Sequence, residues 1–283
     1  MITCNLKGGL GNQLFQIFAT IVYSMKRKDK IVFRNVEQLL IGNCRPTYWN
    51  SFLESLKILT KDNINISNYY LLQYNEQQYK DIFKEQTPEN VILDGYFQSY
   101  KYFIEYEKSL FSMIRLQQQQ ESIKKEYYYI LNDKTPIISM HFRLGDYKNL
   151  QDCHNILKEN YYINSLIEIK KQIDPSSIKI LFFCEKEDNQ IIYSYIRRIS
   201  FETKIDMSKF IKVPDEIPDY KQMLIMSVCD HNIIANSTFS WWGAYFNRNP
   251  EKIVCYPSKW FGPKLHHFDT SDLFLDDWIR VID

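Results

Sequence analysis

Three segments of the sequence place polar side chains directly after a short apolar run. In the first, "IISM" is followed by His141 and Arg143, with Asp146 three residues further on. Imidazole, guanidinium and carboxylate groups can bind an anion, orient a nucleophile or transfer a proton. The segment therefore joins a strand-like pattern to side chains that suit an active site.

Two more apolar runs end in the same way. Glu185 follows "ILFFC", and Ser237 and Thr238 follow "NIIAN". The hydroxyls open the segment "TFSWWGAYF" and are typical of a helix N-cap. Taken singly, each cluster is also explained by ordinary structure, such as a solvated charge or a capped helix. Because the carboxyl ends of parallel strands meet at one edge of a sheet, the three clusters together favour a ligand site.

The chemistry that these clusters share is anion binding. A helix that begins with hydroxyl residues presents backbone N–H groups and the positive end of its dipole. Arg143 adds a planar set of donors that matches phosphate oxygens. The stretch "GGLGNQ" at residues 8–13 places glycines before a helical pattern, so that the backbone there can approach a ligand closely. A ligand that carries phosphate is the class these features favour.

Strands and helices must alternate to position these residues. The chain opens with a strand-like "MITCNL", the glycine stretch, a helical pattern over residues 14–28 and a second strand at "KIVF", which together predict a parallel crossover unit. From residue 135 onward, continuous apolar runs alternate with amphipathic segments, a pattern typical of a parallel sheet covered on both faces. The sequence predicts an α/β protein with two Rossmann-like domains.

The predicted boundaries divide the chain into three parts. Residues 1–130 form an N-terminal Rossmann-like domain, residues 131–265 a C-terminal Rossmann-like domain, and residues 266–283 a tail helix that packs near the domain junction. Within the less regular middle, residues 47–59 and 100–114 look helical. The run "NVILDGYF" looks like a strand that meets a turn.

Composition and motifs exclude several classes of function. The net charge of +1 predicts no nucleic-acid partner. The six cysteines have no metal-binding spacing, which favours a reduced, cytoplasmic protein. Neither a signal peptide nor an apolar run of about 18 residues is present, so no membrane span is expected.

Two nucleotide-binding motifs are also disfavoured. Leu14 replaces the third glycine of a dinucleotide fingerprint, and Arg34 and Asn35 stand where an acid would hold the ribose. The glycine–lysine signature of a P-loop is absent.

Four segments, in this order along nearly the whole chain, resemble the family 11 glycosyltransferases, the α-1,2-fucosyltransferases. They are "GGLGNQLFQ", "GYFQSYKYF", "HFRLGDY" and "HNIIANSTFSWWGAYF". The resemblance implies a GT-B-like fold, in which two Rossmann-like domains face a central cleft. The N-terminal domain, residues 1–130, lies on the acceptor side, and the C-terminal domain, residues 131–265, binds the nucleotide sugar GDP-fucose. It implies an inverting, metal-independent transfer of L-fucose from GDP-β-L-fucose to a sugar hydroxyl of a glycan, most often O2 of a galactose, without any cofactor. A transferase that uses another nucleotide sugar, and a non-catalytic nucleotide- or carbohydrate-binding protein on the same scaffold, are the alternatives.

The resemblance also assigns roles to residues. Arg143 is expected to bind the β-phosphate and stabilise the departing GDP. From its own position, only a turn after Arg143, Asp146 is expected to act as general base or as a brace that orients Arg143 or caps the loop. The residues expected to bind substrate are Gly11, Asn12, Gln13, His141, Glu185, Gln222, Ser237, Thr238, Phe239 and Ser240.

This chain departs from the family pattern at three places. Leu144 stands where a second arginine is usual, "CEK" at Cys184–Lys186 stands where "SDD" is frequent, and Gln222 stands where an aspartate is common. The first change removes a positive charge beside the phosphates. The last changes guanine recognition, because a carboxamide both donates and accepts where a carboxylate only accepts.

Overall fold

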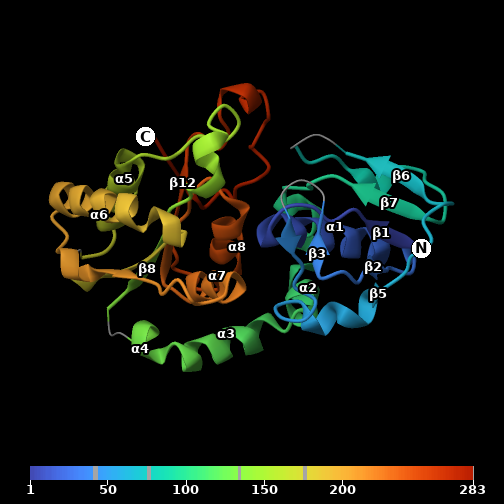
Figure 1. Ribbon diagram of the computed structural model, residues 1–283, viewed down its shortest axis with the longest axis horizontal. Coiled ribbons are helices and arrows are strands. Elements are labelled where there is room, and N and C mark those ends of the chain that lie inside the picture. Colours follow the sequence, from blue (N-terminus) through green and yellow to red (C-terminus); the bar gives the residue numbers. More distant parts are fainter. Residues whose placement is uncertain (41–43, 75–77, 133–134, 175–176, 283) are drawn as a thin grey trace. The chain divides into compact units, whose positions relative to one another are not determined.

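Figure 1 shows the helices and strands of the protein in a computed structural model, in which parallel sheets alternate with helices along the chain. The chain divides into two units: Met1–Gln117 with Phe268–Leu275, and Gln118–His267 with Asp276–Asp283. The structure describes every residue except 41–43, 75–77, 133–134, 175–176 and 283.

The first unit contains a three-stranded sheet. Its strands β1 (Ile2–Cys4), β7 (Val91–Asp94) and β6 (Tyr70–Gln73) pair in parallel in the order β1-β7-β6. Helix α1 (Leu10–Arg27) follows β1 after the glycine stretch and is buried along most of its length, as its apolar sequence predicts. The predicted strand–loop–helix opening is confirmed.

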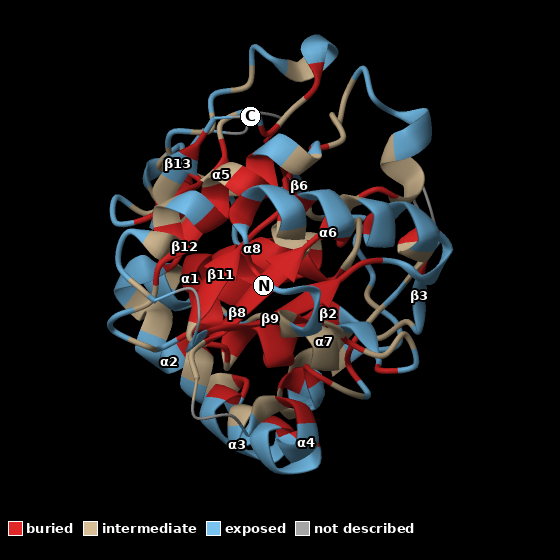
Figure 2. Ribbon diagram, turned by 90° about the vertical axis from the view of Figure 1, so that its left-hand side faces the viewer, coloured by how far each residue is buried: buried red, intermediate tan, exposed pale blue. Residues whose placement is uncertain are grey.

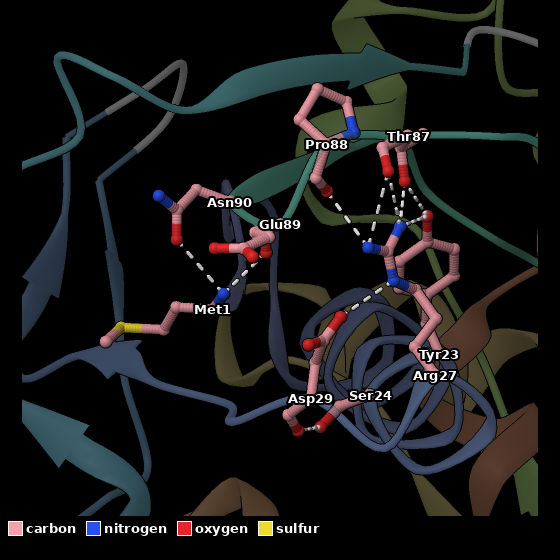
Figure 3. A network of polar contacts seen from close by, with 9 residues as sticks. All are labelled: Met1, Tyr23, Ser24, Arg27, Asp29, Thr87, Pro88, Glu89 and Asn90. Atoms are coloured by element: carbon pink, nitrogen blue, oxygen red, sulfur yellow. Dashed lines mark hydrogen bonds and ion pairs between the residues drawn. The ribbon is translucent and has the colours of Figure 1, made fainter.

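The far end of α1 is tied to the segment that leads into β7 (Figure 3). Arg27 donates from Nη2 to the carbonyl of Pro88 at 2.9 Å and from Nε to the carboxylate of Asp29 at 2.8 Å. The amino group of Met1 donates to Asn90 Oδ1 at 3.0 Å. These bonds hold the helix and the first strand against the same neighbour.

Short elements complete the first unit. Strand β2 (Phe33–Arg34) pairs in parallel with β5 (Thr60–Lys61), and β3 (Gln38–Leu39) pairs antiparallel with β4 (Arg45–Pro46). The helix expected over residues 47–59 is present only as a 3-10 helix at its second half, η1 (Glu54–Leu59).

The helix expected over residues 100–114 is divided. Two 3-10 turns, η3 (Tyr100–Tyr102) and η4 (Ile104–Tyr106), precede α2 (Glu107–Met113). The adjacent rings of Tyr102 and Phe103 are both buried, against Phe97 and Phe18 respectively. Phe103 has a φ of −140° and lies between the two turns, so the helix is interrupted at this residue.

The second unit is built on a six-stranded parallel sheet. The order in space is β10-β9-β8-β11-β12-β13, so that in chain order the strands run 3-2-1-4-5-6, the order of dinucleotide-binding sheets. The strands are β8 (Ile137–His141), β9 (Lys179–Phe183), β10 (Phe210–Lys212), β11 (His231–Ile233), β12 (Val254–Pro257) and β13 (Ile279–Val281).

Four helices cover this sheet in two pairs. Helix α5 (Glu159–Lys170) packs on α6 (Asn189–Thr203), and α7 (Asp219–Ser227) packs on α8 (Thr238–Phe246). Because right-handed crossovers run one way from β8 to β10 and the other way from β10 to β12, the two pairs lie on opposite faces. Figure 2 shows the strands as a buried band beneath helices whose outer surfaces are exposed.

The division between the units falls after Gln117, earlier than the predicted boundary after residue 130. Helices α3 (Leu116–Glu126) and α4 (Tyr128–Leu131) belong largely to the second unit. Gln120 donates to the carbonyl of Phe246 at 3.0 Å, and Lys179 Nζ donates to the carbonyl of Ile130 at 2.7 Å. These long-range bonds are invisible in the local sequence.

The predicted tail helix is wrong. Within the described residues 266–282 the only regular element is β13, the outermost strand of the second sheet. Its Val281 carbonyl accepts from the amide of Ser258 at 2.8 Å. The preceding Phe268–Leu275 belongs to the first unit, where the Asp272 carboxylate accepts from the amide of Tyr79 at 3.2 Å and pairs with Lys101. Sheet pairing and burial of Trp278 override the local helical pattern.

The predicted fold class is confirmed as α/β, with a parallel sheet in each of two Rossmann-like units. Among the described residues, no helix combines the length and the apolar character that crossing a membrane requires.

Candidate functional site

The strand order of the second sheet reverses between β8 and β11. In open parallel sheets, ligands bind at such a reversal, beyond the carboxyl ends of the strands. Strand β8 ends at His141, and β11 ends at Ile233, four residues before the N-cap of α8. The sequence-predicted clusters at His141 and Ser237 therefore both lie at the topological switch point.

Arg143 lies just beyond the end of β8 with its side chain 17% exposed. Its guanidinium forms ion pairs with the carboxylates of Asp146, through Nη2, and of Glu185, through Nη1. Its central carbon lies 4.9 Å from the centre of the Tyr147 ring, within the range of a cation–π contact. Three neighbours therefore hold the guanidinium, and the structure brings Glu185 to Arg143 as predicted.

Tyr147 connects the Arg143 loop to the start of α8. Its hydroxyl donates to the carbonyl of Asn236 at 3.1 Å. The ring of His154 stacks on that of Tyr147, with 4.6 Å between the ring centres and 15° between the ring planes. The Asn236 amide in turn donates to the carbonyl of Trp260 at 3.2 Å. The loop is thus fixed to residues that immediately precede the helix.

Helix α8 begins with its own hydroxyl cap. Ser237 is the N-cap, and its Oγ accepts from the amide of Phe239 at 3.4 Å. Ser240 Oγ accepts from the amide of Ala235 at 3.2 Å, which fixes the turn between strand and helix. The first intrahelical bond runs from Trp241 N to the Ser237 carbonyl at 3.1 Å. The start of this helix carries the positive end of the helix dipole, which suits an anion.

His141 lies beside this helix start. Its ring is 5.6 Å from that of Phe239, its carbonyl accepts from the Tyr162 hydroxyl at 3.1 Å, and its buried Nδ1 has no hydrogen-bond partner among the described residues. Burial, with a smaller contribution from the positive charge of Arg143, lowers the pKa of His141 to about 3. The imidazole is therefore neutral at physiological pH and is suited to hydrogen-bond a ligand.

A buried carboxylate braces the loop that carries Arg143. Asp188 accepts from the amide of Gly145 at 2.8 Å through Oδ2 and forms an ion pair with Lys148 through Oδ1. Gly145 has a φ of +38°, and a Cβ there would lie 2.5 Å from Glu185 Oε2. Only glycine meets both demands without displacement of the loop.

The structure shows where two of the departures from the family pattern, Leu144 and Gln222, lie. Leu144 is 3% exposed and belongs to the hydrophobic core, so this position contributes no cation to the site. Gln222, in the first turn of α7, donates from Nε2 to the carbonyl of Ile217 at 2.8 Å. This bond ties its carboxamide to the residue before the N-cap of its helix, and its contact with guanine stays a prediction.

The predicted residues of the first unit lie at the start of α1. Gln13 is fully buried and donates from Nε2 to the carbonyls of Gly8 and Pro46, each at 2.9 Å. Asn12 Oδ1 accepts from Gln98 Nε2 at 2.9 Å, and Gly11 is buried in the helix. The structure gives these side chains a part in shaping the glycine loop, and their contact with an acceptor stays a prediction.

Sequence reasoning missed Tyr147, His154 and Asp188. Tyr147 lies four residues after Arg143, a spacing that would have suggested a contact across one turn. His154 and Asp188 reach the site only through tertiary packing, which the local sequence pattern does not predict.

The site offers neither a nucleophilic thiol nor a preformed metal centre. Burial raises the pKa of the nearby Cys184 thiol to about 12, so it stays protonated. In the part of the chain that the structure describes, no three His, Cys, Asp or Glu side chains are grouped so that they could hold a metal ion. The groups present are a guanidinium, a helix start and a neutral imidazole, which together suit a diphosphate joined to a nucleoside.

Comparison with known proteins places the chain in a family. The model of glycosyl transferase family 11 matches residues 1–281. An α-1,2-colitosyltransferase of Escherichia coli is 26% identical, with 99% of each chain covered, and a galactoside 2-α-L-fucosyltransferase of Caenorhabditis elegans is 21% identical over 89% of this chain and 71% of its own. Among solved structures, a point mutant of Arabidopsis thaliana FUT1 in complex with GDP matches with a TM-score of 0.48 and 12% identity, over 90% of this chain and 70% of that one.

Proposed function

We propose that this chain, which belongs to glycosyl transferase family 11, transfers L-fucose from GDP-β-L-fucose to a sugar hydroxyl of a glycan. The chain is a glycosyltransferase, and the donor, the acceptor and the metal independence of the reaction are our proposal. The observation that carries it is the joining of Arg143 to the N-terminus of α8, through Tyr147, at the switch point of the second sheet.

The leaving group determines what the site must do. Departure of GDP places negative charge on the β-phosphate, and that charge must be neutralised as the bond to fucose C1 breaks. Arg143 can donate two hydrogen bonds to phosphate oxygens, and the α8 start can donate backbone N–H groups beside Ser237. The arrangement supports a transfer in which protein groups, without a metal, carry this stabilisation.

The proposed reaction is a single displacement with inversion. The acceptor oxygen attacks fucose C1 from the face opposite GDP, and the C1–phosphate oxygen bond breaks with its electron pair passing to GDP. The sugar ring has oxocarbenium character at the transition state, as in glycoside hydrolysis. The acceptor proton is lost to a base or to solvent.

Asp146 acts in this scheme as a brace. Its carboxylate pairs with Nη2 of Arg143, three residues earlier on the same loop. An ion pair in this position aims the guanidinium and occupies the carboxylate. Service as the general base is the alternative role of Asp146, and its pH–rate profile distinguishes the two.

His141 contacts the nucleoside in the proposed complex. Its ring lies against Phe239 at the helix start, and its buried Nδ1 lacks a partner among the described residues. A neutral imidazole can accept or donate one hydrogen bond to a base or ribose. Gln222 is the proposed guanine contact on α7.

The acceptor is a galactose-containing glycan in this proposal, and O2 of the galactose is the attacking hydroxyl. The support is the Caenorhabditis elegans relative, a galactoside 2-α-L-fucosyltransferase. The α-1,2 linkage is also the one in the name of the Escherichia coli relative.

A second donor is favoured by one observation. The relative with 26% identity over 99% of this chain is a colitosyltransferase. Colitose differs from fucose by the loss of one hydroxyl, at C3. A site that binds its donor mainly through the diphosphate therefore suits the nucleotide-activated form of either sugar. A transferase of activated colitose is therefore the alternative enzyme.

Donor choice is tested by GDP release in the presence of a β-galactoside. Purified chain is mixed with GDP-fucose, GDP-colitose, GDP-mannose or UDP-galactose, and released nucleotide is measured with and without acceptor. We expect acceptor-dependent release of GDP from GDP-fucose and identification of an α-1,2 linkage in the product. Faster turnover of GDP-colitose would replace fucose by colitose, and release from UDP-galactose alone would refute the proposal.

A further inference from the structure

The immediate charge around Arg143 opposes the binding of an anion. One guanidinium stands between two carboxylates, Glu185 and Asp146, so one positive and two negative charges leave a net charge of −1. A diphosphate that approached this arrangement would meet a guanidinium whose terminal nitrogens are already engaged. Departure of one carboxylate would remove the excess negative charge and free a terminal nitrogen of Arg143 for phosphate.

Glu185 is the carboxylate that can move. Its side chain is 46% exposed and lies outside the loop of Arg143, whereas Asp146 is 32% exposed and three residues from Arg143 on the same loop. Exposed ion pairs contribute little free energy, so exchange of partners at Glu185 costs little. Asp146 can stay with Arg143 through Nη2 while Nη1 is released.

The position of Glu185 in the sheet indicates where its carboxylate goes. It lies two residues after Phe183, the end of β9, which is the second strand of a sheet with the order 3-2-1-4-5-6. In dinucleotide-binding sheets of this order, an acidic residue in this region hydrogen-bonds the ribose hydroxyls of the nucleotide. A carboxylate is acceptor-only when ionised, and therefore matches two neighbouring hydroxyl donors.

We propose that Glu185 exchanges partners when the donor binds: it leaves Arg143 and accepts hydrogen bonds from the ribose hydroxyls, so that Arg143 becomes available to the diphosphate. This inference rests on the proposed function, because it takes the donor to be a ribonucleoside diphosphate sugar. It makes Glu185 both a mask on Arg143 in the empty site and a determinant of selectivity for ribose over deoxyribose.

Gly145 is what allows the masked arrangement. Its missing Cβ would lie 2.5 Å from Glu185 Oε2, so the carboxylate reaches Arg143 across the backbone of a glycine. The neighbouring Glu187 is also exposed, and within the described residues the partner of Arg143 Nη1 is Glu185 and not Glu187. Glu187→Gln therefore provides a matched control, two residues further along the same loop and with the same change of charge.

The test compares Glu185→Gln with Glu187→Gln by calorimetry, with inorganic pyrophosphate, GDP, 2′-deoxy-GDP and 3′-deoxy-GDP as probes. Removal of the masking charge should tighten pyrophosphate binding by about fivefold in Glu185→Gln, the scale of one exposed ion pair. The wild-type chain should prefer GDP to the deoxy analogues by roughly tenfold, as expected for a hydrogen bond to a charged group. That preference should fall to about threefold or less in Glu185→Gln and stay unchanged in Glu187→Gln.

Other outcomes separate the parts of the inference. Weaker pyrophosphate binding by Glu185→Gln would show that Glu185 only braces Arg143 and would overturn the exchange. An unchanged preference for GDP over its deoxy analogues would overturn the ribose role. If the wild-type chain binds pyrophosphate but not GDP, the proposed donor fails and the ribose role with it, whereas the pyrophosphate comparison still decides whether Glu185 masks Arg143.

Discussion

The guanidinium of Arg143 lies over the ring of Tyr147, 4.9 Å from its centre. The same tyrosine donates its hydroxyl to the carbonyl of Asn236, directly before the N-cap of α8. One side chain thus sets the distance between the two groups that are proposed to hold the donor phosphates. Loss of either contact should weaken donor use without abolishing the fold.

Two substitutions at Tyr147 separate its contacts. Tyr147→Phe keeps the aromatic ring, removes the hydroxyl that donates to Asn236 and should lower kcat/KM for the donor about fivefold. Tyr147→Leu also removes the aromatic face under Arg143 and should lower it by roughly a further fourfold. The measurement is initial-rate kinetics with varied GDP-fucose. Tyr128→Phe, at a tyrosine that is 61% exposed on α4, is the control and should have no effect.

Equal rates for Tyr147→Phe, Tyr147→Leu and the wild-type chain would contradict the positioning role of this ring. A loss confined to KM for the acceptor would contradict it as well, since the contacts concern the donor side.

The buried His141 should make the second unit sensitive to acid. Its pKa is about 3 in the folded chain, and an unfolded histidine titrates near 6.5, so the unfolded state binds more protons between these values. The stability that depends on a neutral His141 imidazole is fully present above pH 6.5 and is lost as the pH falls toward 3. The free energy of unfolding should fall by about 1.4 kcal/mol per pH unit from this group alone.

His141→Gln should remove that part of the slope. Urea unfolding followed by tryptophan fluorescence, at pH values from 7 to 4.5, measures the difference between variant and wild type. Four of the five tryptophans lie in the second unit, so the signal reports on the unit that contains His141. The exposed His266→Gln serves as control and should keep the wild-type slope. Parallel curves for all three proteins would show that His141 is not buried as a neutral group.

Gly145→Ala should destabilise the loop for two separable reasons. Its φ of +38° disfavours any Cβ by about 1 kcal/mol, and contact with Glu185 adds to this. In a Glu185→Ala background the contact is absent and only the backbone cost remains. We expect the free-energy change on adding Gly145→Ala to be smaller in that background, as measured by a double-mutant cycle of urea unfolding. Identical changes in both backgrounds would show that the two side chains do not meet.

Much of the fold was predictable because local patterns decide it. The alternation of apolar strands with amphipathic helices after residue 135 determines a parallel sheet, and that sheet places Arg143 and Ser237 at one edge. The tail strand β13 was not predictable, since its pairing partner is β12 and a short three-residue strand has no period of its own. Helix α3 was ambiguous because its glutamines fit a loop or a helix surface, and packing of Gln120 on the second unit decides for helix.

The sequence predicts the charged residues of the site but not the contacts that hold them in place. Arg143 and Glu185 follow strands, where the general rule for parallel sheets directs attention. Their mutual ion pair, the stacking of His154 on Tyr147 and the brace at Asp188 depend on the folding of loops 142–158 and 184–188. Sequence spacing does not encode such contacts between loops.

Asp146→Asn distinguishes a brace from a base. Because the side-chain oxygen of asparagine can still accept from Arg143, we expect the rate of transfer to fall by about tenfold, the scale of a weakened charged hydrogen bond, with the pH–rate profile unchanged in shape. Loss of the acidic limb of that profile, together with a fall of about 10³ or more, would assign Asp146 as general base instead.

The central claim is that Arg143 neutralises the departing GDP. The most direct test is single-turnover transfer from GDP-fucose to a β-galactoside by the wild-type chain, Arg143→Lys and Arg143→Ala, with GDP binding measured in parallel. Removal of an electrostatic donor of this kind should slow transfer by about 10² to 10³ in Arg143→Ala, with partial recovery in Arg143→Lys. Transfer by Arg143→Ala at the wild-type rate would contradict the account.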